Sequence, residues 1–294
     1  MHYQGDLLGQ GPLWGFVEGW MGQISFAIAQ AARDLGAQLA TGVPVAEILP
    51  GEGVRLEGGE LIRAAVVVSN ADPRRTLGLV DPAAVPDGYR ARVDGWQLRS
   101  PVVKLNAALH RLPTFPATGG LEPHRAMVDV TRGLDAAQEA FADAERGVPA
   151  IGFAEVYFQT AYDPSVAPPG RHLVSVFAQY APYELAEGDW DGRRDEIGRL
   201  ILDAMASFAP DLPDCVVDHE VLGPPDIERR IGLTGGHIFQ GETMPDQMWE
   251  HRLAARTPVP GLYLCGAATH PAGSVIALNG RNAAMAVLAD TTPA

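Results

Sequence analysis

The C-terminal segment Pro260–Ala289 constrains the fold more than any other part of this 294-residue chain. It places a short apolar strand, Leu262–Cys265, directly before Gly266, and an alanine-rich helix follows around Asn282–Leu288. Glycine and alanine let a backbone pass close to a bulky planar ligand, because a larger side chain would fill the ligand's space. A helix start offers free N–H groups and a positive dipole end to an anionic or carbonyl group. We therefore expect a strand end and a helix start that close over one ligand, although this pattern is common in α/β proteins generally.

The region Met21–Val80 alternates helix and strand, as an α/β domain requires. Apolar residues recur at helical spacing from Met21 to Leu35, and Gly36 is suited to end that helix. The continuous apolar run Ala65–Val68 is typical of a buried strand, and Asp72 should cap a helix that has proline at its first position. Three further short strands are expected, at Gln38–Thr41, Val45–Leu49 and Val54–Glu57.

The middle of the chain changes to an alternation with period two, which is typical of strands with two different faces. Three segments follow this pattern and should form one mixed or antiparallel sheet: Val102–His110, Ile151–Gln159 and His172–Tyr180. In the first of them Lys104 and Asn106 share a face. An amphipathic helix is expected over Asp191–Phe208, and a further strand over Cys215–Val221.

These patterns predict an α/β chain in which one domain is inserted into another. Residues 1–80, with an N-terminal loop, and residues 259–294 would be two pieces of a partial, Rossmann-like nucleotide-binding domain. Residues 81–258 would be an inserted sheet-plus-helix substrate domain of α+β character. If this is right, the strand Leu262–Cys265 should lie in or beside the sheet that contains Val66–Val68.

Composition excludes several classes of partner. The chain has 22 Lys and Arg residues against 36 Asp and Glu, a net charge of −14, which argues against nucleic acid or an anionic membrane surface. No apolar run is long enough to span a membrane, and the first residues lack the features of a signal peptide. Cys215 and Cys265 are expected to be small core residues in a reducing, cytoplasmic setting. The eight histidines show no metal-binding spacing, so we expect no metal site.

Six segments carry motifs in a constant order along the chain. They are GPLWGFVEGWMG at Gly11–Gly22, VVVSNADPRRT at Val66–Thr76, SPVVKLNAALHRLP at Ser100–Pro113, DPSVAPPGRHLVSVFAQYAPY at Asp163–Tyr183, PPDIERRIGLTGGHIF at Pro224–Phe239, and GLYLCGAATHP with GRNAA near the C-terminus. Together they resemble the phytoene-desaturase-like, FAD-dependent oxidoreductases over almost the whole chain. The chain departs from that pattern at Trp20, Ala272, Ala277 and Asn279, and Met248–Arg256 looks shortened, which affects the expected loop geometry.

The resemblance implies an FAD/NAD(P)-binding domain and hydride transfer from a C–H or C–N bond of the substrate to the flavin. It places Met21 and Gly22 near the flavin ring, although this turn is equally an ordinary start of a helix. It places Val45 against adenine through its backbone, although a strand valine is a core residue by default. The flavin cover would come from the C-terminal residues Gly266, Ala267, Gly273, Ser274, Val275, Asn279 and Gly280.

Four residues of the inserted domain are candidates for contact with a small, apolar substrate. Lys104 and Asn106 could point into a cavity, but a solvated sheet face explains them as well. Tyr180 and Tyr183 could line an apolar pocket, but aromatic residues beside proline commonly serve packing. His270 could act as an acid or base, yet a single histidine in a Gly/Pro turn more often hydrogen-bonds the backbone.

The Gly-rich fingerprint GxGxxG, which cradles the pyrophosphate of a dinucleotide, does not occur in this sequence. The segments Gly9–Trp14 and Gly51–Leu56 both fail to match it. Family members carry it in an N-terminal segment, so the resemblance implies the C-terminal portion of a flavoprotein, with its N-terminal half as a partner for tight FAD binding. The alternatives are a non-catalytic module that binds a partner protein, and a carotenoid or retinoid binder with a large apolar cavity.

Overall fold

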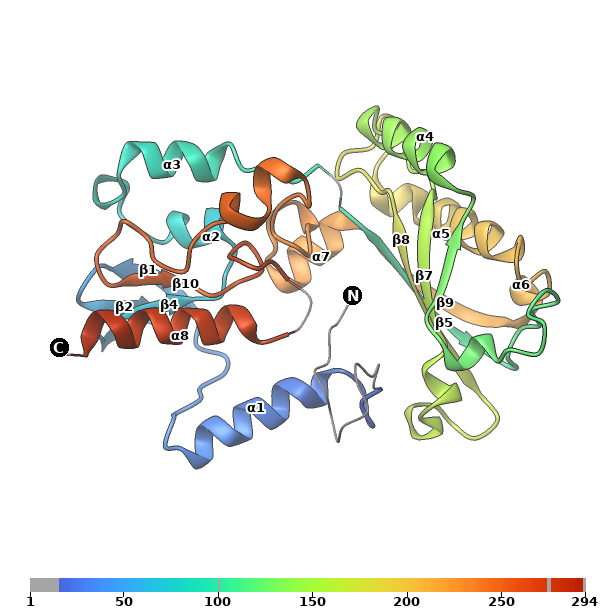
Figure 1. Cartoon of the computed structure of the whole chain (residues 1–294), viewed down its shortest axis with the longest axis horizontal. Helices are drawn as coiled ribbons and strands as arrows, with labels where there is room; N and C mark the ends of the chain where they lie inside the picture. Colours follow the sequence, from blue (N-terminus) through green and yellow to red (C-terminus); the bar gives the residue numbers. More distant parts are fainter. Residues whose placement is uncertain (1–15, 100, 274–275, 293–294) are drawn as a thin grey trace. The chain divides into compact units, whose positions relative to one another are not determined.

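The computed structural model describes residues 16–99, 101–273 and 276–292, which fall into two compact units (Figure 1). Unit one contains residues 40–98 and 228–292, and unit two contains residues 16–39 and 99–227. The expected boundaries lay after residues 80 and 258, whereas the units divide after Leu98 and Ile227. The first boundary lies later because Val85 and Val93 are buried in the core of unit one together with Val259.

Unit one holds two small sheets and three helices. The strands β1 (Val45–Leu49), β2 (Gly53–Leu56) and β3 (Leu61–Arg63) form an antiparallel sheet, and β4 (Val67–Ser69) pairs in parallel with β10 (Leu262–Leu264). The helices are α2 (Pro73–Gly78), α3 (Asp87–Asp94) and α8 (Leu278–Thr291), while α7 (Pro224–Ile231) spans the second boundary. Short 3₁₀ turns occur in unit one at Pro82–Ala84, Thr234–Gly236, Pro245–Gln247 and Trp249–His251, and in unit two at Pro123–Arg125, Gln159–Ala161 and Pro164–Val166.

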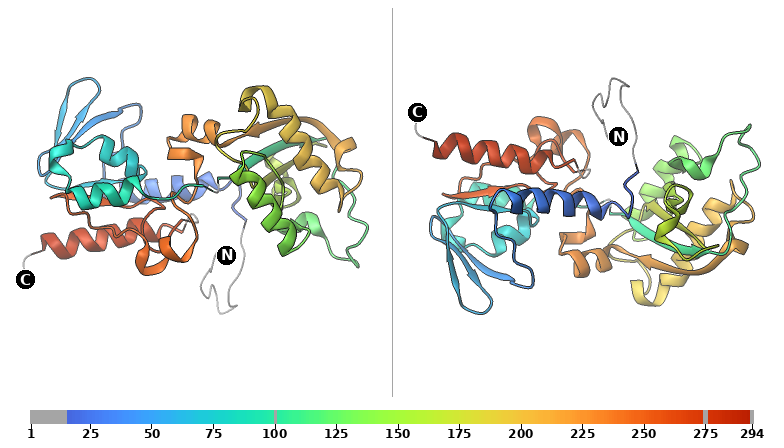
Figure 2. Two further views of the ribbon diagram at one scale, coloured as in Figure 1. Left: turned by 90° about the horizontal axis from the view of Figure 1, so that it is seen from above. Right: turned by 90° about the horizontal axis from the view of Figure 1, so that it is seen from below.

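The parallel pairing of β10 with β4 confirms the expectation from the sequence, with Leu262 opposite Val67. Helix α8 lies on one side of β10, and the β1–β3 sheet lies on the other (Figure 2). On that second side Leu262 packs into a cluster with Ile48 and Leu77. Asp72 caps α2 as expected, because its side chain accepts the backbone N–H groups of Arg74 and Arg75.

Unit two is built on a five-stranded antiparallel sheet in the order β6-β7-β8-β5-β9. Its strands are β5 (Val103–Leu109), β6 (Val128–Thr131), β7 (Phe153–Tyr157), β8 (His172–Gln179) and β9 (Val216–Leu222). Its helices are α1 (Gly22–Asp34), α4 (Leu134–Glu145), α5 (Trp190–Ala206) and α6 (Leu212–Cys215). The three strands expected to form one sheet do so, and the expected helix over Asp191–Phe208 is α5.

The alternation along β5 gives the sheet two different faces. Every second residue of β5 is buried in a core that includes Ile197 and Ile201 of α5. These residues of β5 are Val103, Leu105, Ala107 and Leu109. Lys104 and Asn106 point to the other face and are half-buried. Because side chains of a strand point alternately to opposite faces, the two residues share one surface, as the sequence predicted.

Helix α1 forms where its apolar spacing predicts it, and Gly36, with φ of 92°, follows its end. None of the residues of α1 is buried, and Leu35 is 90% exposed. The segment belongs to unit two through Phe16, which stacks on Tyr162 with ring centroids 3.6 Å apart. The strand expected at Gln38–Thr41 is wrong: these residues have no regular structure, and no partner strand lies beside them among the described residues.

Candidate functional site

Strands β10 and β4 end side by side, and the turn Gly266–Thr269 begins at that point. The backbone N–H of Cys265 donates to the carbonyl of Ser69 over 2.9 Å, which fixes the two strand ends together. Inside the turn, the N–H and the hydroxyl of Thr269 both donate to the carbonyl of Gly266, at 3.0 and 2.8 Å. In parallel sheets ligands bind beyond the carboxyl ends of the strands, so this turn lies where the sequence predicts a ligand.

Gly266 and Gly273 are both needed for close packing within the protein. A Cβ atom at Gly266 would lie 2.6 Å from Oε1 of Gln240 and 3.1 Å from the carbonyl oxygen of Asn70. At Gly273 it would lie 3.1 Å from the Cβ atom of Ala267. Both distances are tighter than side chains normally allow, so these two glycines are explained by neighbouring chain segments without a ligand.

Asn279 ties the turn to the start of α8. Its buried Nδ2 donates to the carbonyl of Gly266 at 3.3 Å, to the carbonyl of Thr269 at 2.9 Å and to the Thr269 hydroxyl at 3.0 Å. The side-chain amide is therefore engaged with the protein itself. Asn279 positions the turn relative to the helix start.

The start of α8 is open in a way that suits an acceptor group. Ala277 precedes the helix with φ of 54°, and its own side chain forms no cap on the first turn. The first N–H groups of a helix have no acceptor within the helix, and the bond from Arg281 to Ala277 is the first that closes a turn. A Cβ atom at Gly280 would meet nothing within 4 Å. Ser274 and Val275, the two other predicted cover residues, lie outside the described residues.

Arg252 is a residue that the sequence analysis missed. Arg252 as a whole is 3% exposed, and its guanidinium donates to the carbonyls of Phe239, Ala267, Glu242 and Gln247, at 2.8 Å for Ala267 and 3.1 Å for Glu242. Burial lowers the pKa of Arg252 to about 10, and the Glu242 carboxylate acts in the opposite direction. One buried cation thus joins the turn at Ala267 to the segment 239–247.

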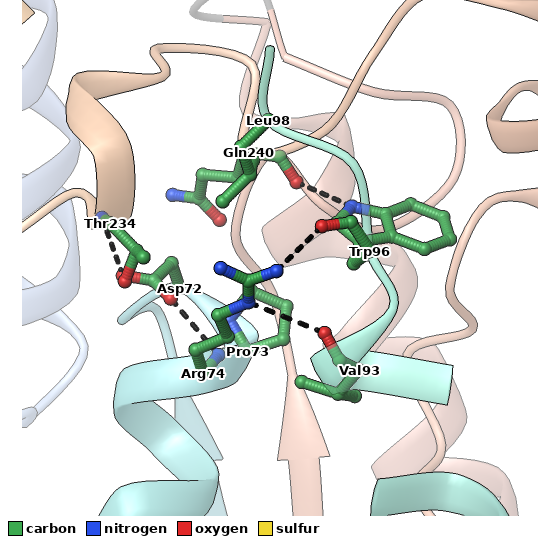
Figure 3. A pocket seen from close by; sticks show the side chains of 8 residues that line it. All are labelled: Asp72, Pro73, Arg74, Val93, Trp96, Leu98, Thr234 and Gln240. Carbon is green, nitrogen blue, oxygen red and sulfur yellow. Dashed lines mark hydrogen bonds between the residues drawn. The ribbon is translucent and has the colours of Figure 1, made fainter. Parts of the chain in front are cut away.

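A small pocket in unit one is lined by residues that support the same turn (Figure 3). Trp96 donates its indole N–H to the carbonyl of Gln240 at 2.8 Å, and Oε1 of Gln240 accepts from the backbone of Ala268 at 3.3 Å. Asp72 accepts from the N–H and hydroxyl of Thr234 at 3.0 and 2.8 Å. Because these polar groups are bonded to one another, the pocket serves to hold loops in place.

Lys104 is the only lysine in the sequence, among 22 basic residues. It lies on β5 between Phe177 of β8 and Leu222 of β9. Burial lowers the pKa of its ammonium group, and no carboxylate or hydrogen-bond partner for it is found in the described part of the chain. Two positions along β5, Asn106 accepts a hydrogen bond from Ser175 over 2.8 Å. Besides Phe177 and Leu222, the strand register places Ser175, Glu155 and Glu220 on the same face as Lys104 and Asn106, so apolar and polar side chains are combined there.

We expect the pKa of Lys104 to lie below its ordinary value of 10.5. Between the lowered pKa and 10.5, the folded chain binds fewer protons than the unfolded chain, so stability should rise with pH in that window. Reductive methylation with ¹³C-formaldehyde labels only this side chain and the N-terminal amine, and an NMR titration then reads the pKa directly. The Lys104→Arg variant identifies the signal. A pKa at or above 10.5 would show that Lys104 has a carboxylate partner.

The structure does not gather the other predicted residues around Lys104. Tyr180 packs edge-on against Phe141 of α4 with ring centroids 5.2 Å apart, on the helix-covered side of the sheet. Tyr183 is partly exposed, and its carbonyl accepts from the indole of Trp190 at 3.1 Å. His270 places Nδ1 3.2 Å from the carbonyl of Trp249, so it bonds the backbone as the simpler interpretation predicted.

The remaining predicted cofactor residues belong to different units. Met21 precedes α1 and is 61% exposed, and Gly22 begins that helix with open space where a Cβ atom would be. Val45 begins β1 in unit one and is half-buried opposite Leu56. Their contact with a cofactor stays a prediction.

Two kinds of feature are absent from the described residues. No group of three or more His, Cys, Asp or Glu side chains is arranged to hold a metal ion. No helix has both the length and the apolar character to cross a membrane. Cys215 and Cys265 are free thiols, and a reducing, cytoplasmic setting stays a prediction from the sequence.

Comparison with known proteins assigns the family. A sequence model described as flavin containing amine oxidoreductase matches residues 1–288. The chain belongs to this family. It is also 37% identical, over 98% of its length, to pyridine nucleotide-disulfide oxidoreductase domain-containing protein 2 of Rattus norvegicus, of which it covers 53%. A more distant relative is the neurosporene-forming phytoene desaturase of Cereibacter sphaeroides, 24% identical over 94% of this chain and 54% of that protein.

Solved structures agree on the fold. An oxidoreductase from Methanosarcina mazei superimposes with a TM-score of 0.62 and 18% identity, over 92% of this chain and 55% of that one. At this identity the likeness shows the fold alone. The chain spans about half the length of the curated relatives it matches, and it corresponds to their C-terminal half.

Proposed function

We propose that this chain supplies the substrate-facing sheet and the C-terminal flavin cover of an FAD-dependent oxidoreductase. Flavin, when bound, would accept a hydride from a C–H bond of the substrate, either in a hydrocarbon or beside an amine nitrogen. The observation that carries the proposal is the parallel pair β10–β4, which ends at the Gly266–Thr269 turn beside the uncapped start of α8. Membership of the flavin containing amine oxidoreductases supports FAD as the cofactor.

The residues of this chain supply only part of the contacts that bound FAD would need. The open start of α8 suits a carbonyl or anionic group, and a helix start contributes about 0.3–1 kcal/mol when exposed and up to about 2 kcal/mol when partly buried. Micromolar affinity needs about 8 kcal/mol. A Gly-rich cradle, which this sequence lacks, normally supplies several further N–H bonds to the pyrophosphate. We therefore propose that tight FAD binding requires the N-terminal half of the flavoprotein fold.

Lys104 and Asn106 are proposed to face the substrate. The surface around them is apolar at Phe177 and Leu222, which suits a small apolar molecule. The unpaired ammonium of Lys104 would orient one polar end of that molecule by donating a hydrogen bond. The chain's own contribution to the reaction is thus to bind, orient and exclude water.

The second candidate function is a non-catalytic module that binds a partner protein. The exposed apolar side chains of α1, among them Phe26 and Ile28, favour it, because such surfaces mark sites of protein contact. Co-expression with the N-terminal half of the rat relative separates the two candidates. Purified yellow protein whose flavin is bleached anaerobically by an apolar amine or alkene supports the oxidoreductase. A colourless complex that stays colourless with added FAD supports the module.

A further inference from the structure

His237 is a buried histidine whose ring has no hydrogen-bond partner in the described part of the chain. Its side chain is 2% exposed, and both Nδ1 and Nε2 are buried without a bond. Oε1 of Glu242 lies 3.5 Å from Nε2, which is longer than a normal hydrogen bond. Burying a polar group without a partner is costly, and buried polar groups are nearly always bonded to protein or to ordered water. The ring of His237 therefore points to an occupant that meets its nitrogens.

Glu242 and Arg252 complete a buried polar cluster with this histidine. The side chain of Glu242 is 7% exposed. Burial lowers the pKa of Arg252 and the Glu242 carboxylate raises it, so these two charges interact. Nε of Arg252 is a further buried nitrogen without a hydrogen-bond partner among the described residues. Because the charges of Glu242 and Arg252 offset each other, a neutral His237 leaves the cluster without net charge.

The backbone between His237 and Glu242 is held by contacts outside the cluster. The carbonyl of Gln240 accepts the indole N–H of Trp96 at 2.8 Å, and the N–H of Glu242 donates to the carbonyl of Gln97 at 3.3 Å. Gln240 has φ of 51°, a conformation that a residue other than glycine keeps only where its surroundings enforce it. These contacts fix the loop, so the unpaired nitrogens of His237 are not satisfied by its closing up.

We propose that one buried water molecule binds to His237 and Glu242 in this cluster. A neutral imidazole has one donor and one acceptor, a carboxylate has acceptors only, and Nε of an arginine is a donor. Water both donates and accepts, so it matches this mixed set, and a buried water typically makes about three hydrogen bonds. An anion would be repelled by the Glu242 carboxylate, and a cation by the guanidinium of Arg252.

The loop 237–242 also contacts the Gly266–Thr269 turn. Oε1 of Gln240 accepts from the backbone N–H of Ala268 at 3.3 Å. The bound water holds His237, at the start of the same loop, and so steadies the segment that supports the turn. Its binding needs no flavin and is independent of the proposed function.

The experiment counts long-lived bound water in the whole chain by ¹⁷O magnetic relaxation dispersion. His237→Phe removes both ring nitrogens and keeps a planar ring. His124→Phe is the matched control, because Nε2 of His124 already bonds to the carbonyl of Pro113 at 2.7 Å and its ring also packs against phenylalanine. The ¹⁵N chemical shifts of the imidazole show whether each ring nitrogen of His237 is hydrogen-bonded. Thermal unfolding verifies that each variant folds, and the ¹⁵N shifts decide alone if His237→Phe does not.

We expect His237→Phe to hold one long-lived water molecule fewer than the wild type, and His124→Phe to hold the same number. Both ring nitrogens of His237 should show hydrogen-bonded ¹⁵N shifts that stay unchanged when gluconate replaces chloride in the buffer. Equal water counts in the wild type and His237→Phe, or an equal loss in His124→Phe, would overturn the proposal. A free lone pair on a ring nitrogen, or a ¹⁵N shift that depends on chloride, would overturn it as well.

Discussion

Replacing Arg252 with methionine is expected to lower the free energy of unfolding of unit one by about 3–5 kcal/mol. The substitution removes the donors for two buried and two partly buried carbonyls, and an unsatisfied buried acceptor costs about 1–3 kcal/mol, partly relieved by rearrangement. It also removes the cation beside the indole of Trp96, which lies 5.8 Å from the ring centroid. The turn at Ala267 would lose its link to the segment 239–247.

Hydrogen exchange of the β10 and turn amides measures this loss within unit one, and urea unfolding followed by tryptophan fluorescence reports it globally. Arg252→Lys keeps the charge but cannot reach all four carbonyls, so it should fall between wild type and methionine. Arg281→Met, at an exposed arginine of α8, is the control and should change stability by less than about 0.5 kcal/mol. A loss under about 1 kcal/mol for Arg252→Met would mean that water replaces the guanidinium and that the turn is held by other contacts.

Two glycine substitutions should act in opposite directions on stability. Gly266→Ala places a Cβ atom 2.6 Å from Oε1 of Gln240 and 3.1 Å from the carbonyl of Asn70, so one of these groups must shift, at a cost of about 1–3 kcal/mol. Gly280→Ala meets open space within α8 and should stabilise the chain by about 0.4–1 kcal/mol. The physical difference is that only Gly266 is contacted by other parts of the protein.

Gly280→Ala also distinguishes an effect on stability from an effect on cofactor binding. If the start of α8 faces the flavin, Gly280→Ala should weaken FAD binding by the completed enzyme while leaving the isolated chain at least as stable as wild type. Urea denaturation of the chain measures its stability. An FAD titration of its complex with the N-terminal half measures the affinity for FAD. Unchanged FAD affinity for Gly280→Ala would remove the start of α8 from the cofactor site.

Local patterns predicted the elements that position the site. The apolar runs ending at Ser69 and Cys265 predicted that β4 and β10 lie together, because buried strands of one α/β domain share a sheet. The alternation at Lys104 and Asn106 predicted their shared face, because the geometry of a strand fixes it. In each case the determining information lies within about ten residues of sequence.

The contacts that hold the turn could not be predicted in this way. Arg252 gathers carbonyls from residues up to 15 positions away, and nothing in its neighbourhood distinguishes a buried arginine from a surface one. Gly266 was predicted to make room for a ligand, but the oxygen of Gln240, distant in sequence, occupies that space. The boundary at Leu98 was missed because it depends on Val85 and Val93 packing against Val259, which is a tertiary contact.

An FAD titration followed by flavin fluorescence tests the central claim most directly. The isolated chain should bind FAD with a dissociation constant well above micromolar, because the start of α8 supplies no more than about 2 of the roughly 8 kcal/mol that micromolar binding needs. Adding the N-terminal half of the rat relative should tighten binding by about 100-fold or more. Submicromolar binding by the isolated chain would contradict the account and would mean that the pyrophosphate site lies within these 294 residues.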